Sequence, residues 1–179
     1  NIYLIINDLG YNVIEPFQKK FPKRFFNAGV SEQNMMGMSA GIASEKGQVF
    51  AYSIANFSTF RCAEQIRNDV DYHKLPVTIV SVGSGLSYGN LGYTHHALQD
   101  YALMRSFPNM LIASPGSNEE LVGTLKYIVK NPQPYYLRLD KDEVKQKNKK
   151  NQIIKPGYLN KIYDGNKKKI ILTTGNVQQ

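Results

Sequence analysis

The sequence GVSEQN stands at residues 29–34 and continues as MMGMSAGIASEK. Ser31 is a favoured helix N-cap, and the small or flexible side chains after it predict a helix over residues 31–46 that Gly47 ends. Glu32 then lies in the first turn, where the helix dipole favours a carboxylate by roughly 0.3–1 kcal/mol. The simplest interpretation of Glu32 is an exposed helix-start acid, and the alternative is a functional carboxylate in an apolar setting.

Short apolar runs alternate with helical patterns on both sides of this stretch. The apolar runs predict strands at residues 2–6, 24–27, 48–53, 77–82, 110–113 and 135–139. The helical patterns predict further helices at residues 13–20, 57–72, 95–106 and 117–129. This alternation predicts a three-layer α/β fold, a mostly parallel sheet with helices on both faces. Functional groups of such sheets collect beyond the carboxyl ends of the strands. There we expect Glu32, residues 56–57, and the loop at residues 83–96, which begins with a glycine-rich loop at residues 83–93.

The positive charge of the chain is concentrated near its end. Ten lysines and three acidic residues lie between Lys141 and Lys169, so this segment carries +7 of the net charge of +8. The rest of the chain is nearly neutral, and we expect no nucleic-acid partner. The Lys/Asn-rich composition predicts a linker over residues 142–168 between a first domain at residues 1–141 and the truncated start of a second at residues 169–179. In this second domain, the apolar run at residues 169–175 predicts a strand.

Other patterns exclude several classes of protein. The chain has one cysteine, no apolar run of about 20 residues and no secretory leader pattern, so we expect a cytoplasmic protein without an internal disulfide or a membrane span. The glycine-rich loop lacks the spacing of dinucleotide- and phosphate-binding motifs, and no G-x-S-x-G elbow is present. The three histidines lack the spacing of metal ligands, and we expect no metal site in this chain.

Five segments in register resemble the pyrimidine-binding domain of the transketolase family. They are RFFNAGVSEQNM at residues 24–35, EQIR at 64–67, GYTHH at 92–96, RSFPNM at 105–110 and SPG at 114–116. The resemblance covers residues 1–141, and residues 169–179 resemble the start of the family's C-terminal domain. It implies the thiamine-diphosphate-binding fold of the pyrimidine-binding type, with thiamine diphosphate as cofactor. The diphosphate-binding domain of the family, which holds Mg²⁺, is implied to be a partner domain or subunit.

The resemblance also implies roles for individual residues. Glu32 matches the catalytic glutamate that hydrogen-bonds the aminopyrimidine ring nitrogen of the cofactor remote from the thiazolium. Phe57 is the first choice for stacking on that ring and Phe60 the second, although core packing is an alternative for both and the simpler one for Phe60. Arg61 matches an arginine that supports the site, with a surface salt bridge as the alternative.

Further roles concern the substrate. His95 matches the histidine that contacts substrate hydroxyls and is expected to act in catalysis, with loop anchoring as the alternative. His96 and Asn90 are expected as further substrate contacts, and Lys141 lies near the family arginine that grips the substrate phosphate. Leu91 departs from the family, because many transketolases carry an aspartate there that reads a sugar hydroxyl.

The implied activity is transfer of a two-carbon ketol unit between sugars, by a chain that is inactive without its diphosphate-binding partner. The implied substrates are phosphorylated or nucleotide-linked sugars, and the implied assembly is a homodimer or heterotetramer. The methionines and alanines of the central helix are expected to face that partner. Two alternatives stay open: a deoxyxylulose-phosphate-synthase-like or 2-oxoacid-dehydrogenase-like chain, and a non-catalytic assembly module of the same fold.

Overall fold

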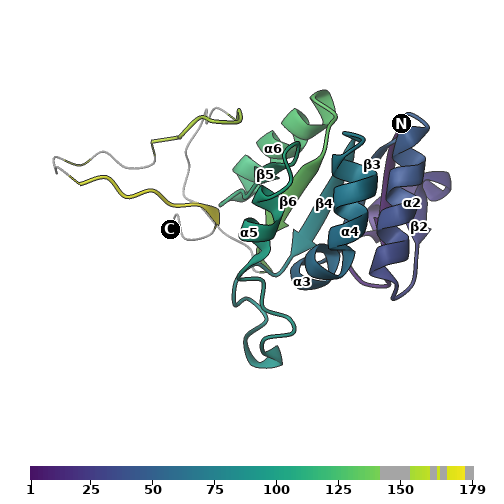
Figure 1. Ribbon diagram of the computed structural model, residues 1–179, viewed down its shortest axis with the longest axis horizontal. Helices are drawn as coiled ribbons and strands as arrows, with labels where there is room; N and C mark the ends of the chain where they lie inside the picture. The colour runs from purple at the N-terminus through teal and green to yellow at the C-terminus, as the bar shows by residue number, and fades with distance from the viewer. Residues whose placement is uncertain (142–153, 162–164, 166–168, 176–179) are drawn as a thin grey trace.

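A computed structural model describes residues 1–141, 154–161, 165 and 169–175. Its centre is one parallel sheet of six strands in the order β2-β1-β3-β4-β6-β5 (Figure 1). The strands are β1 (Ile2–Ile6), β2 (Phe25–Asn27), β3 (Gln48–Ile54), β4 (Val77–Val82), β5 (Leu111–Ala113) and β6 (Tyr135–Leu139). The predicted strands of the first domain are therefore confirmed to within a residue. Parallel pairing brings the carboxyl ends of all six strands to one edge of the sheet.

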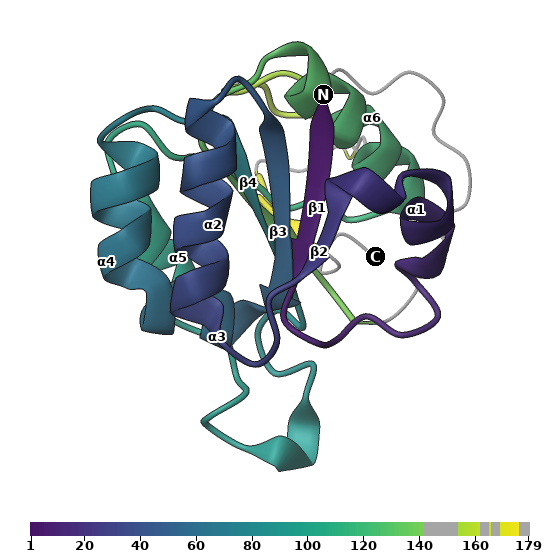
Figure 2. The same ribbon diagram turned by 90° about the vertical axis from the view of Figure 1, so that its right-hand side faces the viewer.

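Helices cover both faces of the sheet, which confirms the predicted three-layer fold (Figure 2). One face carries α2 (Glu32–Ser44), α5 (Asp100–Arg105) and the helical stretch of residues 55–71. The other carries α1 (Glu15–Lys20) and α6 (Asn118–Lys130), and short 3-10 turns form η1 (Pro22–Arg24) and η4 (Gly89–Leu91). Among the described residues, no helix is long and apolar enough to cross a membrane.

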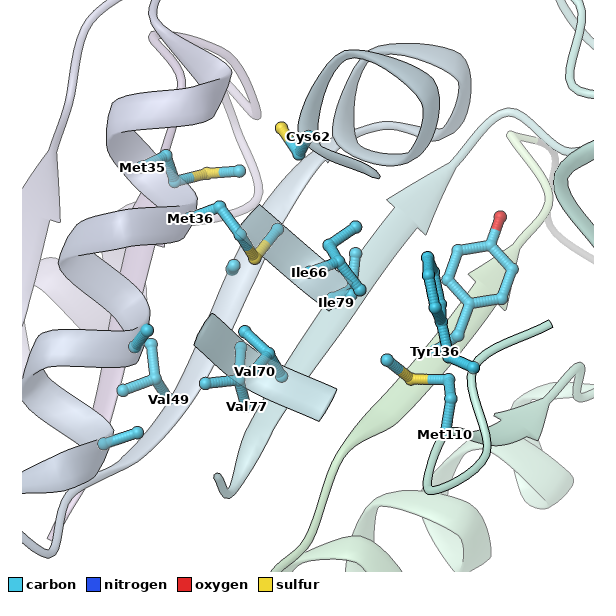
Figure 3. Close-up of a cluster of buried hydrophobic side chains, with 14 of the residues drawn as sticks. Met35, Met36, Val49, Cys62, Ile66, Val70, Val77, Ile79, Met110 and Tyr136 are labelled. Carbon is cyan, nitrogen blue, oxygen red and sulfur yellow. The ribbon is translucent and has the colours of Figure 1, made fainter. Parts of the chain in front are cut away.

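Alternate residues of the strands build a separate core on each face. Ile79 of β4 packs with Met35 and Met36 of α2, whereas its neighbour Val80 packs with Ile128 of α6 (Figure 3 shows the first core). Met35 and Met36 are fully buried. The expectation that the methionines of the central helix face a partner is therefore wrong for these two, because the chain's own sheet covers them.

The helix predicted over residues 57–72 is not continuous. It divides into α3 (Ala55–Thr59), a 3-10 turn η2 (Phe60–Cys62), α4 (Ala63–Gln65) and a π-helical segment η3 (Ile66–Asp71). At the first break, the Ser58 hydroxyl donates to the Ile54 carbonyl at 3.1 Å and that of Thr59 to the Ala55 carbonyl at 2.7 Å. Such bonds to the carbonyl four residues back loosen and bend helices.

The breaks change which side chains reach the core. Ile66 and Val70 are fully buried, as helical spacing predicts, but Phe60 is 44% exposed. Core packing is therefore the wrong interpretation of Phe60, because the 3-10 turn that begins at this residue alters the helical phase relative to Ile66.

Two other predicted elements differ from the structure. The helix predicted from His95 begins only at Asp100, because Gly92 takes a left-handed φ of +76° and Ala97 pairs with Gly85 in an antiparallel bridge instead. No strand forms over residues 169–175, where Ile170 and Ile171 are 88% and 85% exposed and lack the neighbouring strand that pairing requires. Residues 142–153, 162–164 and 166–168, most of the predicted linker, lie outside the described residues.

Candidate active site

The loop before Glu32 is fixed by side chains at the carboxyl ends of β1 and β2. Asn27 Oδ1 accepts hydrogen bonds from the Asp8 and Gly29 amides, each at 2.9 Å, and Asn7 Nδ2 donates to the Gly29 carbonyl at 2.9 Å. Gly29 can meet both partners because it adopts a φ of +70°. These contacts determine where the chain enters α2, and hence where Glu32 lies.

Ser31 occupies the N-cap position, as predicted, but does not cap with its side chain. Its hydroxyl donates to the Ala28 carbonyl at 2.7 Å, and the Ser31 side chain accepts no hydrogen bond from the first amides of the helix. The capping role expected of Ser31 is therefore wrong: its hydroxyl stabilises the preceding turn instead.

Glu32 is a buried carboxylate, with only 4% of its surface exposed. Its Oε2 accepts a hydrogen bond from Arg61 Nη1 at 2.7 Å, and among the described residues Oε1 has no hydrogen-bond partner. The interpretation of Glu32 as an exposed helix-start acid is therefore wrong. A buried charge requires a hydrogen-bonding partner, which Arg61 provides here. Arg61 is half exposed, so this ion pair contributes modestly to stability and mainly holds the carboxylate in place.

Phe57 links this pair to the loop after β4. The Arg61 guanidinium lies 4.8 Å from the centre of the Phe57 ring, and the His95 ring lies 5.1 Å from it at 65°, an edge-on arrangement. One chain of contacts therefore joins Glu32, Arg61, Phe57 and His95, and we call it the Glu32–His95 chain. Its members come from three separate segments, each of which follows a strand.

The loop that carries His95 is held on both sides. Asn56 Nδ2 donates to the Thr94 carbonyl at 2.7 Å, and the Thr94 hydroxyl lies 3.0 Å from His95 Nδ1. The Tyr88 ring lies 5.8 Å from the His95 ring on another side. Tyr88 fits there because residue 83 is glycine: a Cβ at Gly83 would come within 1.9 Å of the Tyr88 ring.

Sequence reasoning missed Tyr88 as part of the site. The only signal was an aromatic residue in the glycine-rich loop, which does not say what the ring contacts. Burial raises the pKa of the Tyr88 hydroxyl above its ordinary value. Tyr88 is therefore protonated near neutral pH and can donate a hydrogen bond.

The other expected site residues lie around this chain rather than in it. Among the described residues, no hydrogen bond, ion pair or ring contact joins Phe60 or Asn90 to it, and both are exposed. His96 Nε2 donates to the Gly89 carbonyl at 2.8 Å and so anchors the loop. Leu91 is 52% exposed, and Lys141 Nζ lies 5.4 Å from the centre of the Tyr88 ring.

Cys62 lies behind the site and is fully buried. Its thiol lies 3.7 Å from the Phe57 carbonyl, to which it donates. Burial first, and the negative charge of Glu32 second, raise the pKa of Cys62 to about 12. The thiol is therefore not a nucleophile near neutral pH. Among the described residues, no group of three His, Cys, Asp or Glu side chains is placed to hold a metal ion.

Comparison with known proteins identifies the family. Residues 7–147 match the family model described as the transketolase pyrimidine-binding domain. This chain belongs to that family. It is 36% identical to the putative transketolase C-terminal section of Methanocaldococcus jannaschii, over 100% of this chain and 58% of that protein.

Two further proteins are similar to this chain, one by sequence and one by structure and sequence. The chain is 34% identical to an apulose-4-phosphate transketolase subunit of Actinobacillus succinogenes, over 86% of this chain and 50% of that protein. Among solved structures, a split-gene transketolase described as an inactive beta4 tetramer matches with a TM-score of 0.71 and 35% identity, over 81% of this chain and 46% of that one. Several 1-deoxy-D-xylulose-5-phosphate synthases also match part of the chain. The chain spans about half the length of the transketolase relatives it matches.

Proposed function

We propose that this chain supplies the pyrimidine-binding half of a thiamine-diphosphate-dependent transketolase, a transferase of two-carbon ketol units. In this proposal a diphosphate-binding domain or subunit completes the site and holds Mg²⁺. The observation that carries the proposal is the burial of the Glu32 carboxylate. Arg61 holds this carboxylate at 2.7 Å and also contacts Phe57, which in turn contacts His95. A carboxylate is rarely buried for stability alone, because its desolvation is costly.

The residues present fit an aminopyrimidine ring. Glu32 Oε1 has no partner among the described residues, so it can meet a ring nitrogen. Phe57 offers an aromatic ring next to Arg61, which holds that carboxylate, and Phe60, 44% exposed, offers a second. Arg61 holds the other carboxylate oxygen, which orients Oε1.

Thiamine diphosphate, when bound, supplies the thiazolium carbon that carries the ketol unit. The chain's own residues bind and move protons around it. Glu32 shares a proton with the ring nitrogen at Oε1, and the apolar surroundings strengthen that bond by excluding water. His95 donates a hydrogen bond to a sugar oxygen and can exchange a proton there, with Asn90 and His96 as further contacts.

A partner subunit and a phosphorylated or nucleotide-linked sugar complete the proposal. The names of two relatives, a subunit of an apulose-4-phosphate transketolase and a beta4 tetramer of a split-gene transketolase, support a divided enzyme that forms a homodimer or heterotetramer. Lys141, beside Tyr88, could meet a phosphate as a point charge. The single, buried cysteine supports a reducing compartment, and we place the enzyme in the cytoplasm.

Calorimetry tests the divided site. Thiamine diphosphate with Mg²⁺ is titrated into this protein alone and into its mixture with a diphosphate-binding subunit. We expect heat of binding only in the mixture, and its loss in Glu32→Ala but not in Glu45→Ala, an exposed acid at the other end of α2. Strong binding by this protein alone would overturn the division of the site. A stable complex that binds no cofactor would favour the non-catalytic assembly module.

A second candidate shares the cofactor and is favoured by the matches to 1-deoxy-D-xylulose-5-phosphate synthases. Such an enzyme, or one related to the 2-oxoacid dehydrogenases, decarboxylates its donor. Product analysis of the reconstituted enzyme separates the candidates: carbon dioxide released from pyruvate supports the second, whereas transfer from a ketose phosphate without carbon dioxide supports the first.

A further inference from the structure

A buried ion pair lies beneath the loop that carries His95. Asp100, the first residue of α5, is fully buried, and its Oδ2 accepts hydrogen bonds from Arg138 Nε at 2.6 Å and from the Tyr136 hydroxyl at 2.7 Å. Both donors belong to β6. Burial, followed by the charge of Asp100, raises the pKa of the Tyr136 hydroxyl, so Tyr136 remains a donor. Nothing in the proposed reaction uses these three residues directly.

On one side the ion pair holds the His95 loop. Arg138 Nη2 donates to the Ala97 carbonyl at 3.0 Å. Ala97 in turn exchanges two backbone hydrogen bonds with Gly85, at 2.9 and 3.0 Å, which close the base of the loop. His95 is two residues from this closure. The Arg138 guanidinium, whose position fixes the closure, is itself held by Asp100 and lies 4.4 Å from the Tyr101 ring.

On the other side the contacts reach α3. Ser81 Oγ lies 2.7 Å from Ser58 Oγ, and Ser81 is also a neighbour of the Tyr136 hydroxyl. Ser58, Ser81, Tyr136 and Asp100 each have 0% of their surface exposed. Ser58 directly follows Phe57. Buried polar side chains therefore lie between the element that carries Phe57 and the ion pair beneath the loop that carries His95.

We infer that Asp100 is a positioning residue that fixes His95 against Phe57 through Arg138 and the closure at Gly85 and Ala97. The inference rests on the proposed function for its catalytic meaning. Removing one member of a buried, hydrogen-bonded ion pair is costly, so the Asp100–Arg138 pair permits few alternative positions of the loop. Asp100 is the branch point: its Oδ2 accepts from both Arg138 and Tyr136, whereas its Oδ1 has no partner among the described residues.

The test follows the loop directly by NMR of the intact protein, without cofactor or substrate. Asp100→Asn keeps the shape of the side chain and removes its charge. We expect the ring signals of His95 to lose the shift caused by the edge-on Phe57 ring. We also expect the amides of Gly85 and Ala97 to exchange at least about tenfold faster, while those of Ile79 and Val80 in β4 change little.

Two controls accompany this variant. His73 is exposed and stands beyond the far end of η3, so its signals should not move. Asp71→Asn changes another buried aspartate, which holds the Asn109 amide at 3.0 Å before β5 begins. It should lower global stability and leave the His95 signals in place. Arg138→Lys, which keeps the charge and loses the fork that reaches Ala97, should reproduce the effect on the loop and decides the question if Asp100→Asn does not fold.

The inference would be overturned if the signals of His95, Gly85 and Ala97 were unchanged in Asp100→Asn or in Arg138→Lys. Equal acceleration of exchange at every amide would also overturn it. In the reconstituted enzyme, Arg138→Lys should raise KM for the sugar donor more than it raises the Kd of thiamine diphosphate. Because the NMR readout requires no cofactor, its failure is distinguishable from a failure of the proposed transketolase activity.

Discussion

Two stretches with similar helical patterns on the same face of the sheet adopt different structures. Residues 32–44 form one regular helix, α2, whereas residues 55–71 pass through α, 3-10, α and π geometry. In α2 the roles are separated along the sequence: Glu32 leads into the site, and Met35 and Met36 fill the core. In the second stretch the roles alternate, since Arg61, which holds Glu32, directly precedes the fully buried Cys62.

The comparison teaches how irregular helices serve a site. A regular helix turns about 100° per residue, so it presents neighbouring functional residues to one spot only at fixed spacings. Phe57 and Arg61 keep one of these spacings, four residues, and both belong to the Glu32–His95 chain. The 3-10 turn that begins at Phe60 instead leaves the Phe60 ring 44% exposed beside them. Local departures from α geometry are frequent at functional sites.

The largest effect is expected from Glu32→Gln in α2. Loss of the proton-sharing carboxylate should lower the turnover of the reconstituted enzyme by about 10²- to 10⁴-fold, while circular dichroism shows an intact fold. Glu45→Gln at the exposed end of the same helix should have no effect on turnover. Near wild-type turnover in Glu32→Gln would contradict the assigned role.

The next effect concerns the core side of α2. Met36→Ala should reduce the free energy of unfolding by about 2–5 kcal/mol, because it leaves a cavity in a fully buried site. Met38→Ala, at a partly buried position on the same helix, should cost clearly less in the same denaturant titration. Equal losses in the free energy of unfolding would contradict the tighter burial of Met36.

Arg61→Ala tests the mixed stretch. We expect thiamine diphosphate to bind the reconstituted enzyme about tenfold more weakly, because Glu32 loses its charged hydrogen bond. The free energy of unfolding should also fall, because Glu32 is left buried without its charged partner. Arg67→Ala, an exposed arginine of η3, is the matched control and should alter neither quantity. Undiminished cofactor affinity in Arg61→Ala would remove it from the site.

Near neutral pH the smallest effect is that of Cys62, which becomes visible only as a pH dependence under alkaline conditions. Its pKa is raised to about 12 in the folded protein from about 9, so the unfolded chain releases this proton first as the pH rises. Stability from Cys62 is therefore complete below pH 9 and declines toward pH 12, by about 1 kcal/mol per pH unit. Urea titrations of wild type and Cys62→Ala should differ in this slope. Parallel pH profiles would contradict the burial of the thiol charge.

The sequence was sufficient for the six strands of the first domain and for the place of Glu32 at the start of α2, because apolar runs mark buried parallel strands and the motif around residue 32 is local. It was insufficient for the breaks in residues 55–71, because a hydrophobic pattern does not reveal local changes of helical geometry such as the one beside the hydroxyl bonds of Ser58 and Thr59. The role of Tyr88 and the Asp100–Arg138 pair depends on contacts across the fold. Such contacts leave no periodic signal in a single sequence.

The assignment of Glu32 is tested most directly by a double comparison of cofactor affinity in the reconstituted enzyme. Wild type and Glu32→Ala are each titrated with thiamine diphosphate and with an analogue in which a carbon–hydrogen group replaces the ring nitrogen that faces Glu32. We predict that the replacement weakens binding by wild type at least about tenfold and has no further effect in Glu32→Ala, since the two changes remove the same hydrogen bond. An equal penalty in both proteins would show that Glu32 does not contact this nitrogen and would contradict the proposed site.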